Sequence, residues 1–275
     1  MNSLFRLQSP SPADIEAFHN DGYIYYPNVL KDDAREELIE EILHLDPVSQ
    51  YLNGLEKGAV DAPLYFVRPW NERGPVGHQL IVDPFVKALL QATMGPDYHF
   101  CHSALNLAPR GAGPGGYHQD HHHWKHENPV NIAERAGYYI QILYYPNGFS
   151  VGDRNLKVIP GSHRVAPTEA ATPERMLAGA YDGEAGRKLE EVRLQVPPGS
   201  MVYINARIFH AIEAKPVDSS QPYRIFNIDI FKQAGPPHRY TQEIPREWSA
   251  GADAYRQQLF LRDPYSEGCW ETQEV

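Results

Sequence analysis

A glycine turn that runs into a histidine-rich segment constrains this chain more than any other feature. Residues 115–124 read GGYHQDHHHW. On a β-strand, side chains two residues apart share a face and lie about 6.6 Å apart, so His118 and Asp120 can face one metal ion. A second, distant histidine would complete a 2-His-1-carboxylate site, which binds Fe(II) and leaves positions open for a co-substrate and dioxygen. A solvent-exposed histidine loop and an adventitious histidine tract are the alternatives for this segment alone.

Short apolar segments separated by turns that contain Pro and Gly fill much of the chain on both sides of this segment. The aromatic content, 17 Tyr, 10 Phe and 4 Trp, favours strands because aromatic rings pack well on a half-buried sheet. Several short strands with turn signals between them predict a mainly β fold, either a sandwich or a barrel. The predicted strands cover 99–107, 138–144, 156–159, 192–196, 201–205 and 223–231.

Helix signals are concentrated in the N-terminal part of the chain. A capping serine at position 11, followed by proline, predicts a short helix that ends at Gly22. A strand over 23–27 follows, and apolar residues at helical spacing predict helices over 32–45 and 84–94. These helices are expected to lie against the core.

Residues 47–79 show no periodicity and are punctuated by Gly and Pro. A long irregular stretch inside a compact protein is usually either disordered or a functional lid. Arg68 and Trp70 lie among further aromatic residues in this stretch, which favours a lid that contacts substrate.

The length of 275 residues fits one barrel or sandwich domain, and no repeat or shift in composition marks a boundary. We therefore expect a single domain over 1–275. Its β core is expected at about 98–232, its helical support at 11–95 and a C-terminal segment that wraps the surface at 233–275.

Charge and cysteine content narrow the class of partner. A net charge of −10 without any basic run disfavours nucleic-acid binding. No segment has the length of a membrane span and the N-terminus lacks the apolar core of a signal peptide, so we expect a cytoplasmic protein that does not enter a membrane. Cys101 and Cys269 are too few for a disulfide framework and are expected as thiols. A small-molecule substrate fits best, and the oligomeric state is left open.

His210 and Arg224 are the distant residues that would complete a site with His118 and Asp120. His210 follows the predicted strand 201–205 after a short connection, and two sheets folded face to face would bring it over the metal segment. Arg224 opens the last apolar strand, where an unpaired guanidinium is costly. Its planar fork suits a carboxylate, such as the far carboxylate of a keto acid that chelates the metal.

The order of these motifs resembles the phytanoyl-CoA dioxygenase family of Fe(II)/2-oxoglutarate oxygenases. His-Gln-Asp at 118–120 is followed by Pro-Gly-Ser-His at 160–163, by Pro-Gly-Ser at 198–200 before a strand, by His210, and by Arg224 on the next strand. The resemblance extends from about residue 22 to residue 231, which is most of the chain.

This resemblance implies a double-stranded β-helix, or cupin-like jelly roll, with flanking helices. It implies that His118, Asp120 and His210 are the ligands of Fe(II), and that Arg224 pairs with the C5 carboxylate of 2-oxoglutarate. Dioxygen would be the second co-substrate. Asp120 also matters because related halogenases carry a small residue there, so its presence favours hydroxylation or another oxidation over halogenation.

Three features depart from the family pattern. The segment between His210 and Arg224 is longer than usual, which residues 215–220 could accommodate as a longer hairpin loop. Ile212 stands where some members place a hydroxyl residue that helps hold the 2-oxoglutarate carboxylate. The segment 144–155 is also longer than the usual acidic turn.

Further polar and aromatic residues are candidates for the walls of the site. Asn106 either contacts the keto acid or is an exposed strand residue, and Trp124 either walls the substrate pocket or belongs to the core. Tyr139 and Gln141 share one strand face, so both point inward or neither does. The three histidines at 121–123 are not expected as ligands. The candidates for lining the substrate pocket are Trp124, Tyr139, Gln141, Arg68 and Trp70.

Three functions are compatible with these residues. The first is hydroxylation of an unactivated C–H bond with release of succinate and CO2, and the second is desaturation, ring closure or epoxidation by the same cofactors. The third is a non-redox, metal-binding isomerase or binding protein of the cupin type, in which Arg224 would have no purpose. The acidic chain favours a polar or cationic metabolite, such as an amino-acid derivative or a natural-product intermediate, over a long acyl-CoA.

Overall fold

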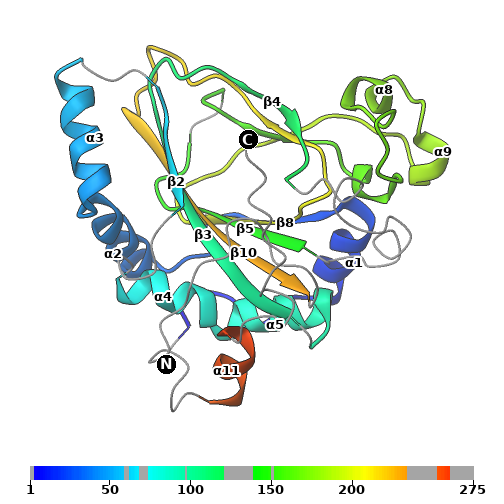
Figure 1. Ribbon diagram of the computed structural model, residues 1–275, viewed down its shortest axis with the longest axis horizontal. Coiled ribbons are helices and arrows are strands. Elements are labelled where there is room, and N and C mark those ends of the chain that lie inside the picture. The colour runs from blue at the N-terminus through cyan, green and yellow to red at the C-terminus, as the bar shows by residue number, and fades with distance from the viewer. Residues whose placement is uncertain are drawn as a thin grey trace, which may run out of the picture.

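Two antiparallel sheets form the centre of the molecule (Figure 1). The computed structural model describes residues 3–58, 62–67, 74–96, 98–120, 139–149, 152–233 and 253–260. The larger sheet has the order β1-β8-β5-β10-β3-β2 and the smaller one β4-β9-β6-β7. The larger sheet contains β1 (Tyr23–Tyr26), β2 (Leu64–Val67), β3 (Tyr98–Pro109), β5 (Tyr139–Tyr145), β8 (Ser200–Asn205) and β10 (Tyr223–Gln233). The smaller sheet contains β4 (Gly115–His118), β6 (Leu156–Val158), β7 (Val192–Leu194) and β9 (His210–Ile212).

The chain crosses between the two sheets repeatedly from β3 to β10. It runs from β3 in the larger sheet to β4 in the smaller, back to β5, over to β6 and β7, and then through β8, β9 and β10 in alternation. This path is that of a double-stranded β-helix, so the predicted jelly roll is confirmed. Residues such as Leu143, Val202 and Phe226 of the larger sheet pack in one cluster with Leu156 and Val158 of the smaller.

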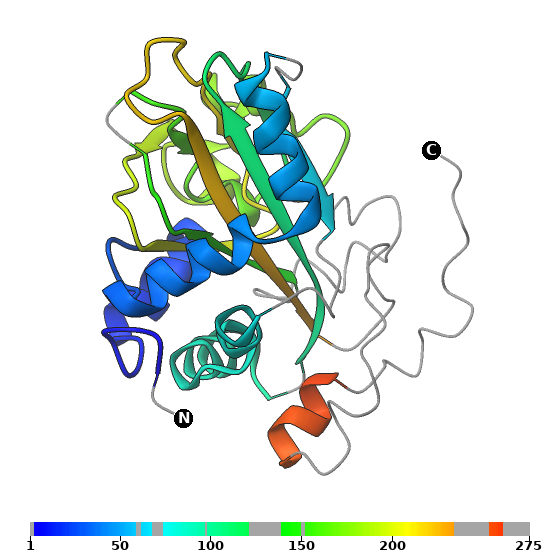
Figure 2. The ribbon, with the colours of Figure 1, turned by 90° about the vertical axis from the view of Figure 1, so that its left-hand side faces the viewer.

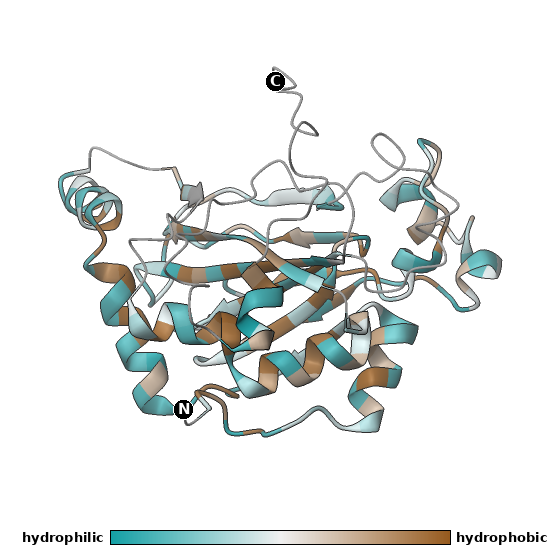
Figure 3. Ribbon diagram, turned by 60° about the horizontal axis from the view of Figure 1, so that its bottom comes forward, coloured by the Kyte–Doolittle hydropathy of each residue, from teal (hydrophilic) through white to brown (hydrophobic). Residues whose placement is uncertain are grey.

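Helices cover the other face of the larger sheet (Figures 1 and 2). Leu38, Ile42 and Phe85 of these helices share a core with Ile142 and Tyr203 of the sheet, and Figure 3 shows hydrophobic residues along the strands and on the helices beside them. The described helices of the whole chain are α1 (Pro12–Asp21), α2 (Asp32–Leu43), α3 (Asp46–Glu56), α4 (Pro75–Val82), α5 (Pro84–Met94), α8 (Pro173–Leu177), α9 (Asp182–Ala185) and α11 (Ala254–Phe260), with a 3-10 turn η2 (Ser162–Arg164). Of these, α8 and α9 do not cover this face but pack in a separate cluster with Ile159 and Phe209 (Figure 1).

The first helix begins and ends at the predicted residues. The Ser11 hydroxyl accepts from the Asp14 backbone N–H, and the Asp14 carboxylate accepts from the Ser11 N–H, which is a capping box. Gly22 ends the helix with φ 85°, and a Cβ at this position would collide with the His163 ring. Glycine is therefore needed here both for backbone conformation and for space.

The prediction that residues 47–79 are irregular is wrong for most of the stretch. It contains most of α3, the edge strand β2 and the start of α4. Val48 and Tyr51 are buried along α3, and Pro47 lies in the first turn, where proline does not break a helix. The glycine and proline residues in this stretch were therefore wrongly interpreted as signs that it contains no helix. Arg68 and Trp70, on which the lid hypothesis depended, lie outside the described residues.

Beyond residue 233, the C-terminal segment is described only over 253–260. Within it, α11 buries Leu259 and Phe260, and the Phe260 ring lies 6.2 Å from that of Phe100 on β3. Cys101 is buried, and Cys269 lies outside the described part of the chain. None of the described helices is long and apolar enough to cross a membrane.

Candidate metal centre

β4 and β9 bring the two candidate histidines side by side at one end of the barrel. His118, the last residue of β4, pairs with His210, the first residue of β9. The Asp120 backbone N–H donates to the Ala206 carbonyl at 3.1 Å. This hydrogen bond holds the Asp120 carboxylate beside the two imidazoles. One ligand atom from each of the three side chains lies within 4.8 Å of the others.

The imidazoles are oriented by hydrogen bonds to the backbone. His118 Nδ1 lies 2.9 Å from the Gly116 carbonyl oxygen, and His210 Nδ1 lies 3.2 Å from that of Ile208. A ring N–H that donates to a carbonyl leaves Nε2 as the atom with the free lone pair. The two Nε2 atoms indeed face Asp120, at 3.6 Å for His118 and 3.1 Å for His210.

Burial differs across the three side chains. The His118 side chain is 46% exposed, that of Asp120 24% and that of His210 7%, so the cluster is open on the His118 side. Burial lowers the pKa of His210, but the charge and hydrogen bond of Asp120 and the Ile208 carbonyl outweigh burial, and the pKa is raised overall. Asp120 therefore supplies the negative charge that a divalent cation at this point would share.

Arg224 lies fully buried on the inner face of β10. Its Nη2 donates to Asn106 Oδ1 at 3.0 Å, while Nε and Nη1 have no hydrogen-bond partner among the described residues. The guanidinium carbon lies 4.6 Å from the centre of the Phe226 ring, and burial lowers the pKa of Arg224 to about 9. No described carboxylate lies within ion-pair distance of it. Two unmatched donors in a dry site fit an anion that brings two acceptor oxygens.

Asn106 is buried, and both the oxygen and the nitrogen of its side-chain amide form hydrogen bonds. Besides accepting from Arg224, it donates from Nδ2 to the Leu64 carbonyl of β2 at 3.0 Å. The alternative of an exposed strand residue is therefore wrong. The structure places Asn106 as the residue that orients Arg224 and ties it to the edge strand.

A buried ion pair near Arg224 was not anticipated from the sequence. Lys215 Nζ lies 2.9 Å from both carboxylate oxygens of Asp153 and 2.8 Å from Ser219 Oγ. The neighbouring Arg154 donates to the Gly113 carbonyl at 2.8 Å, just before β4. The pair lies 62 positions apart in sequence, so no local signal could have revealed it.

Tyr139 and Gln141 both point inward from β5. Tyr139 packs in the core between the sheets together with Leu143, while Ile140 and Ile142 belong to the core on the helix side, so alternation places Gln141 inward as well. Trp124 and the histidines 121–123 lie outside the described residues.

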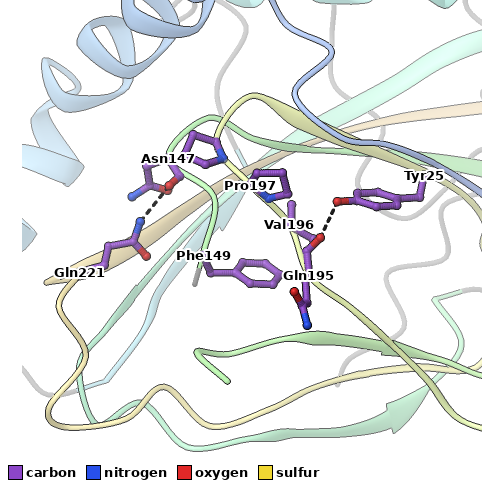
Figure 4. A pocket seen from close by; sticks show the side chains of 8 residues that line it. Tyr25, Asn147, Phe149, Gln195, Val196, Pro197 and Gln221 are labelled. Carbon is purple, nitrogen blue, oxygen red and sulfur yellow. Dashed lines mark hydrogen bonds between the residues drawn. The ribbon is translucent and has the colours of Figure 1, made fainter. Parts of the chain in front are cut away.

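Figure 4 shows the residues that line a surface pocket of about 510 Å³. This pocket lies at the opposite end of β5 from the candidate metal ligands. It is lined by Tyr25, Phe149, Gln195 and Gln221 among others. β5 starts beside Ala206, which contacts Asp120, and ends at Tyr145 just before this pocket. Its seven residues span roughly 20 Å, so the pocket is separate from the metal cluster.

Comparison with solved structures identifies the same fold in enzymes with small-molecule chemistry. The carbocyclase SnoK from nogalamycin biosynthesis is 18% identical, with 85% of this chain and 87% of that chain covered at a TM-score of 0.57. EctD from S. alaskensis in its apoform is 18% identical, with 86% and 82% covered at 0.61. The epimerase SnoN, also from nogalamycin biosynthesis, is 17% identical, with 82% and 84% covered at 0.53.

No curated protein sequence matches the chain significantly. The sequence pattern of the phytanoyl-CoA dioxygenase family, in contrast, matches residues 18–225, which include all three candidate metal ligands and Arg224. The predicted family and enzyme class are thereby confirmed. The chain belongs to the phytanoyl-CoA dioxygenase family and is a non-haem iron oxygenase that uses 2-oxoglutarate.

Proposed function

We propose that this enzyme hydroxylates an unactivated C–H bond of a small-molecule metabolite or natural-product intermediate and releases succinate and CO2. In this proposal His118, Asp120 and His210 hold Fe(II), and Arg224 binds the C5 carboxylate of 2-oxoglutarate. The observation that carries it is the pairing of a three-residue ligand cluster, within 4.8 Å, with a buried arginine that has two unmatched donors.

The donor set suits the metal. Two imidazole nitrogens and one carboxylate oxygen are the ligands of non-haem Fe(II) oxygenases and leave further positions open. The backbone carbonyls of Gly116 and Ile208 hold both imidazoles with Nε2 toward the cluster. Such support of the ligands keeps the site assembled before the metal binds.

The chain's own residues bind and orient the co-substrate. Arg224 provides two free N–H donors, and Asn106 holds its third nitrogen in place. Phe226 and Tyr145 pack beside the guanidinium and exclude water, which strengthens a charged hydrogen bond. Bound iron, with 2-oxoglutarate and dioxygen, supplies an oxidant strong enough to break an unactivated C–H bond.

Ring closure and epimerisation are the second candidate outcome. Two of the solved structures with this fold are described as a carbocyclase and an epimerase that depend on alpha-ketoglutarate, while another contains 2-oxoglutarate and 5-hydroxyectoine. Desaturation and epoxidation use the same cofactors. The non-redox alternative gives no role to the two unmatched donors of Arg224, which argues against it.

Succinate release across a metabolite panel tests the proposal. We expect iron-, 2-oxoglutarate- and oxygen-dependent succinate formation that rises with the true substrate, and a product heavier by one oxygen atom. The Asp120→Ala variant should lose this activity. A product that has lost two hydrogens, or has closed a ring, would favour the second outcome. Substrate conversion without 2-oxoglutarate would contradict both.

A further inference from the structure

A second buried arginine, Arg154, lies in the loop between β5 and β6 and is 5% exposed. The first part of the same loop contains Asn147, whose side-chain amide binds the backbone on both sides of Arg224. The Asn147 Oδ1 accepts from the Ile225 N–H at 2.8 Å, and its Nδ2 donates to the Tyr223 carbonyl at 2.9 Å. This loop therefore runs along the start of β10, where Arg224 lies.

Hydrogen bonds hold one nitrogen of the Arg154 guanidinium. Its Nη1 lies 2.8 Å from the Gly113 carbonyl oxygen, 3.4 Å from that of Ala112 and 3.5 Å from that of Glu213. These carbonyls belong to the turn before β4 and to the residue after β9. The Nε atom is buried and has no hydrogen-bond partner among the described residues, and Nη2 donates to none of them either. Two of the three nitrogens thus have unused donors within the described structure.

The charges of Arg154 and Arg224 act on each other and on the same tyrosine. Burial lowers the pKa of Arg224, and the positive charge of Arg154 lowers it further. Burial raises the pKa of Tyr145 to about 12, and the charges of both arginines oppose this rise. The centre of the Tyr145 ring lies 5.8 Å from the guanidinium carbon of Arg224. Both arginines therefore lie around one small, buried region beside Tyr145.

The nearby carboxylate of Asp153 does not neutralise these two charges. Burial lowers the pKa of Arg154 and of Arg224, and the charge of Asp153 only partly offsets this effect. Both carboxylate oxygens of Asp153 accept from Lys215 Nζ at 2.9 Å. No carboxylate of the described residues lies within ion-pair distance of either guanidinium. Burial of two like charges in one region is unfavourable unless an anion accompanies them.

We propose that Arg154 is a second guanidinium for the C5 carboxylate of 2-oxoglutarate, which binds between Arg154 and Arg224. The inference rests on the proposed function, which gives this contact to Arg224 alone. A carboxylate has about four acceptor positions, so it can accept from two guanidiniums at once. Because Arg154 binds only this distal group, it determines the preference for a keto acid that carries a second carboxylate.

Anaerobic titration of the Fe(II)-loaded protein with two keto acids tests the proposal. 2-Oxopentanoate has the chelating group and the five-carbon chain of 2-oxoglutarate but lacks the distal carboxylate. Arg154→Met should raise the Kd of 2-oxoglutarate roughly tenfold to a hundredfold and leave the Kd of 2-oxopentanoate unchanged. The matched control is Arg110→Met, which removes an exposed arginine that donates to the Ser220 carbonyl in the β9–β10 loop. It should change neither Kd.

Two further variants separate binding from folding. Arg154 has φ 56°, in the left-handed region that glycine adopts without a steric cost. Arg154→Gly therefore removes the side chain without straining the loop, and it should give the same selective rise in the Kd of 2-oxoglutarate. Arg154→Lys keeps the charge but not the planar fork, so its Kd should lie between those of the wild-type protein and Arg154→Met.

The outcomes distinguish failure of this inference from failure of the proposed function. An unchanged Kd of 2-oxoglutarate in Arg154→Met and Arg154→Gly would overturn the inference. An equal rise in the Kd of both keto acids would also overturn it, because loss of structure and not loss of a carboxylate contact would explain the change. In either case, a wild-type band that Arg224→Met weakens leaves the proposed function intact. If the wild-type protein shows no band, the proposed function itself fails.

Discussion

In the proposed function, Arg224 and Asn106 together form the binding site for the far carboxylate of 2-oxoglutarate. A fully buried guanidinium without a carboxylate partner is unfavourable, and its retention on an apolar strand indicates that a ligand completes it. Asn106 accepts a hydrogen bond from one of the three guanidinium nitrogens, and the other two have no partner among the described residues. In the proposed function, this unfavourable burial of Arg224 is offset when the C5 carboxylate of 2-oxoglutarate binds.

Replacement of Arg224 should weaken the binding of 2-oxoglutarate more than replacement of Asn106 does. Arg224→Met removes both free donors, and we expect the Kd for 2-oxoglutarate to rise at least about a hundredfold, since each charged hydrogen bond contributes roughly 1.5–3 kcal/mol. Arg224→Lys should recover only part of this loss, because a point charge cannot bind bidentately. Anaerobic titration of the visible band measures Kd, and equal affinity of wild type and Arg224→Met would contradict the assignment.

Asn106→Leu should have a smaller and distinct effect. It removes the acceptor that holds Arg224 Nη2, so the guanidinium is less well oriented and the Kd for 2-oxoglutarate should rise roughly tenfold. The same titration detects this change. A Kd increase as large as that of Arg224→Met would mean that Asn106 itself binds the keto acid.

The sequence identified Arg224 and Asn106 separately but not their contact. The order of the motifs and the position of Arg224 on a predicted strand were enough to predict it as a candidate site residue. The contact depends on the register between β3 and β10, in which Phe226 opposes Asn106 and Arg224 opposes Ala108. A register of this kind is set by packing of the whole sheet, and so it cannot be predicted from either strand alone.

At the scale of elements, the Pro-Gly-Ser-His turn connects the β core to the first helix. His163 is buried against Gly22, and its Nε2 lies 3.2 Å from the His19 carbonyl oxygen. Burial, only partly offset by that carbonyl, lowers the pKa of His163 from 6.5 to about 4. The histidine therefore supports the junction as a neutral ring.

This pKa shift predicts that stability falls on acidification. Between pH 6.5 and about 4 the unfolded chain binds a proton at residue 163 and the folded chain does not. The free energy of unfolding should therefore fall by roughly 3 kcal/mol as the pH drops through this window. Chemical denaturation across this pH range should show a smaller change in the free energy of unfolding for His163→Gln than for the wild-type protein. The exposed His44→Gln serves as control, and parallel wild-type and His163→Gln profiles would contradict the prediction.

Glu41 of α2 caps the neighbouring helix α4. Its carboxylate accepts from the backbone N–H groups of Val76 at 2.8 Å and Gly77 at 3.0 Å. We expect Glu41→Ala to lower the free energy of unfolding by about 1–2 kcal/mol, as loss of a helix cap does. Glu41→Gln should lose less, because one oxygen acceptor remains. Thermal denaturation compares the variants, and an unchanged Tm for Glu41→Ala would refute the cap.

The element scale also shows why part of the prediction failed. α3 was not predicted because Gly54 and Pro47 resemble breaker signals, although its buried residues Val48 and Tyr51 have helical spacing. β2 is only four residues long and gains its hydrogen bonds from β3, so its sequence carries too little periodicity. The longer helices α2 and α5, in contrast, follow directly from their apolar spacing.

At the scale of the whole molecule, the buried pair of Asp153 and Lys215 joins the β5–β6 loop to the β9–β10 loop near Arg224. Asp153 precedes β6, and Lys215 lies in the loop between β9 and β10. Burial lowers the pKa of Lys215, with Asp153 opposing. The pair thereby holds the strand of His210 and the strand of Arg224 in a fixed relation.

Breaking this pair on one side should destabilise the protein strongly. Asp153→Asn leaves a buried ammonium without its counter-charge, and we expect a loss of about 3–5 kcal/mol. The double variant Asp153→Leu with Lys215→Met should lose much less, since no unpaired charge remains. Chemical denaturation of the set measures both values. A double variant as unstable as the single one would show that packing, not charge pairing, dominates at this position.

The jelly roll itself could be predicted because two independent signals agreed. Short apolar strands between turns indicated a barrel or sandwich, and the order of His118, Asp120, His210 and Arg224 indicated the particular barrel. The cross-strand neighbours on β3, β5 and β10 could not be predicted. His99, Lys232 and Tyr139 are far apart in sequence and meet only through the order of strands in the finished sheet.

Anaerobic titration of the Fe(II)-loaded protein with 2-oxoglutarate tests the central claim most directly. If His118, Asp120 and His210 hold the iron beside Arg224, the weak visible band of the chelate should appear and saturate stoichiometrically in the wild-type protein. It should be absent from His210→Ala, in which the metal loses its most buried ligand. No band in the wild-type protein, or an undiminished band in His210→Ala, would contradict the account.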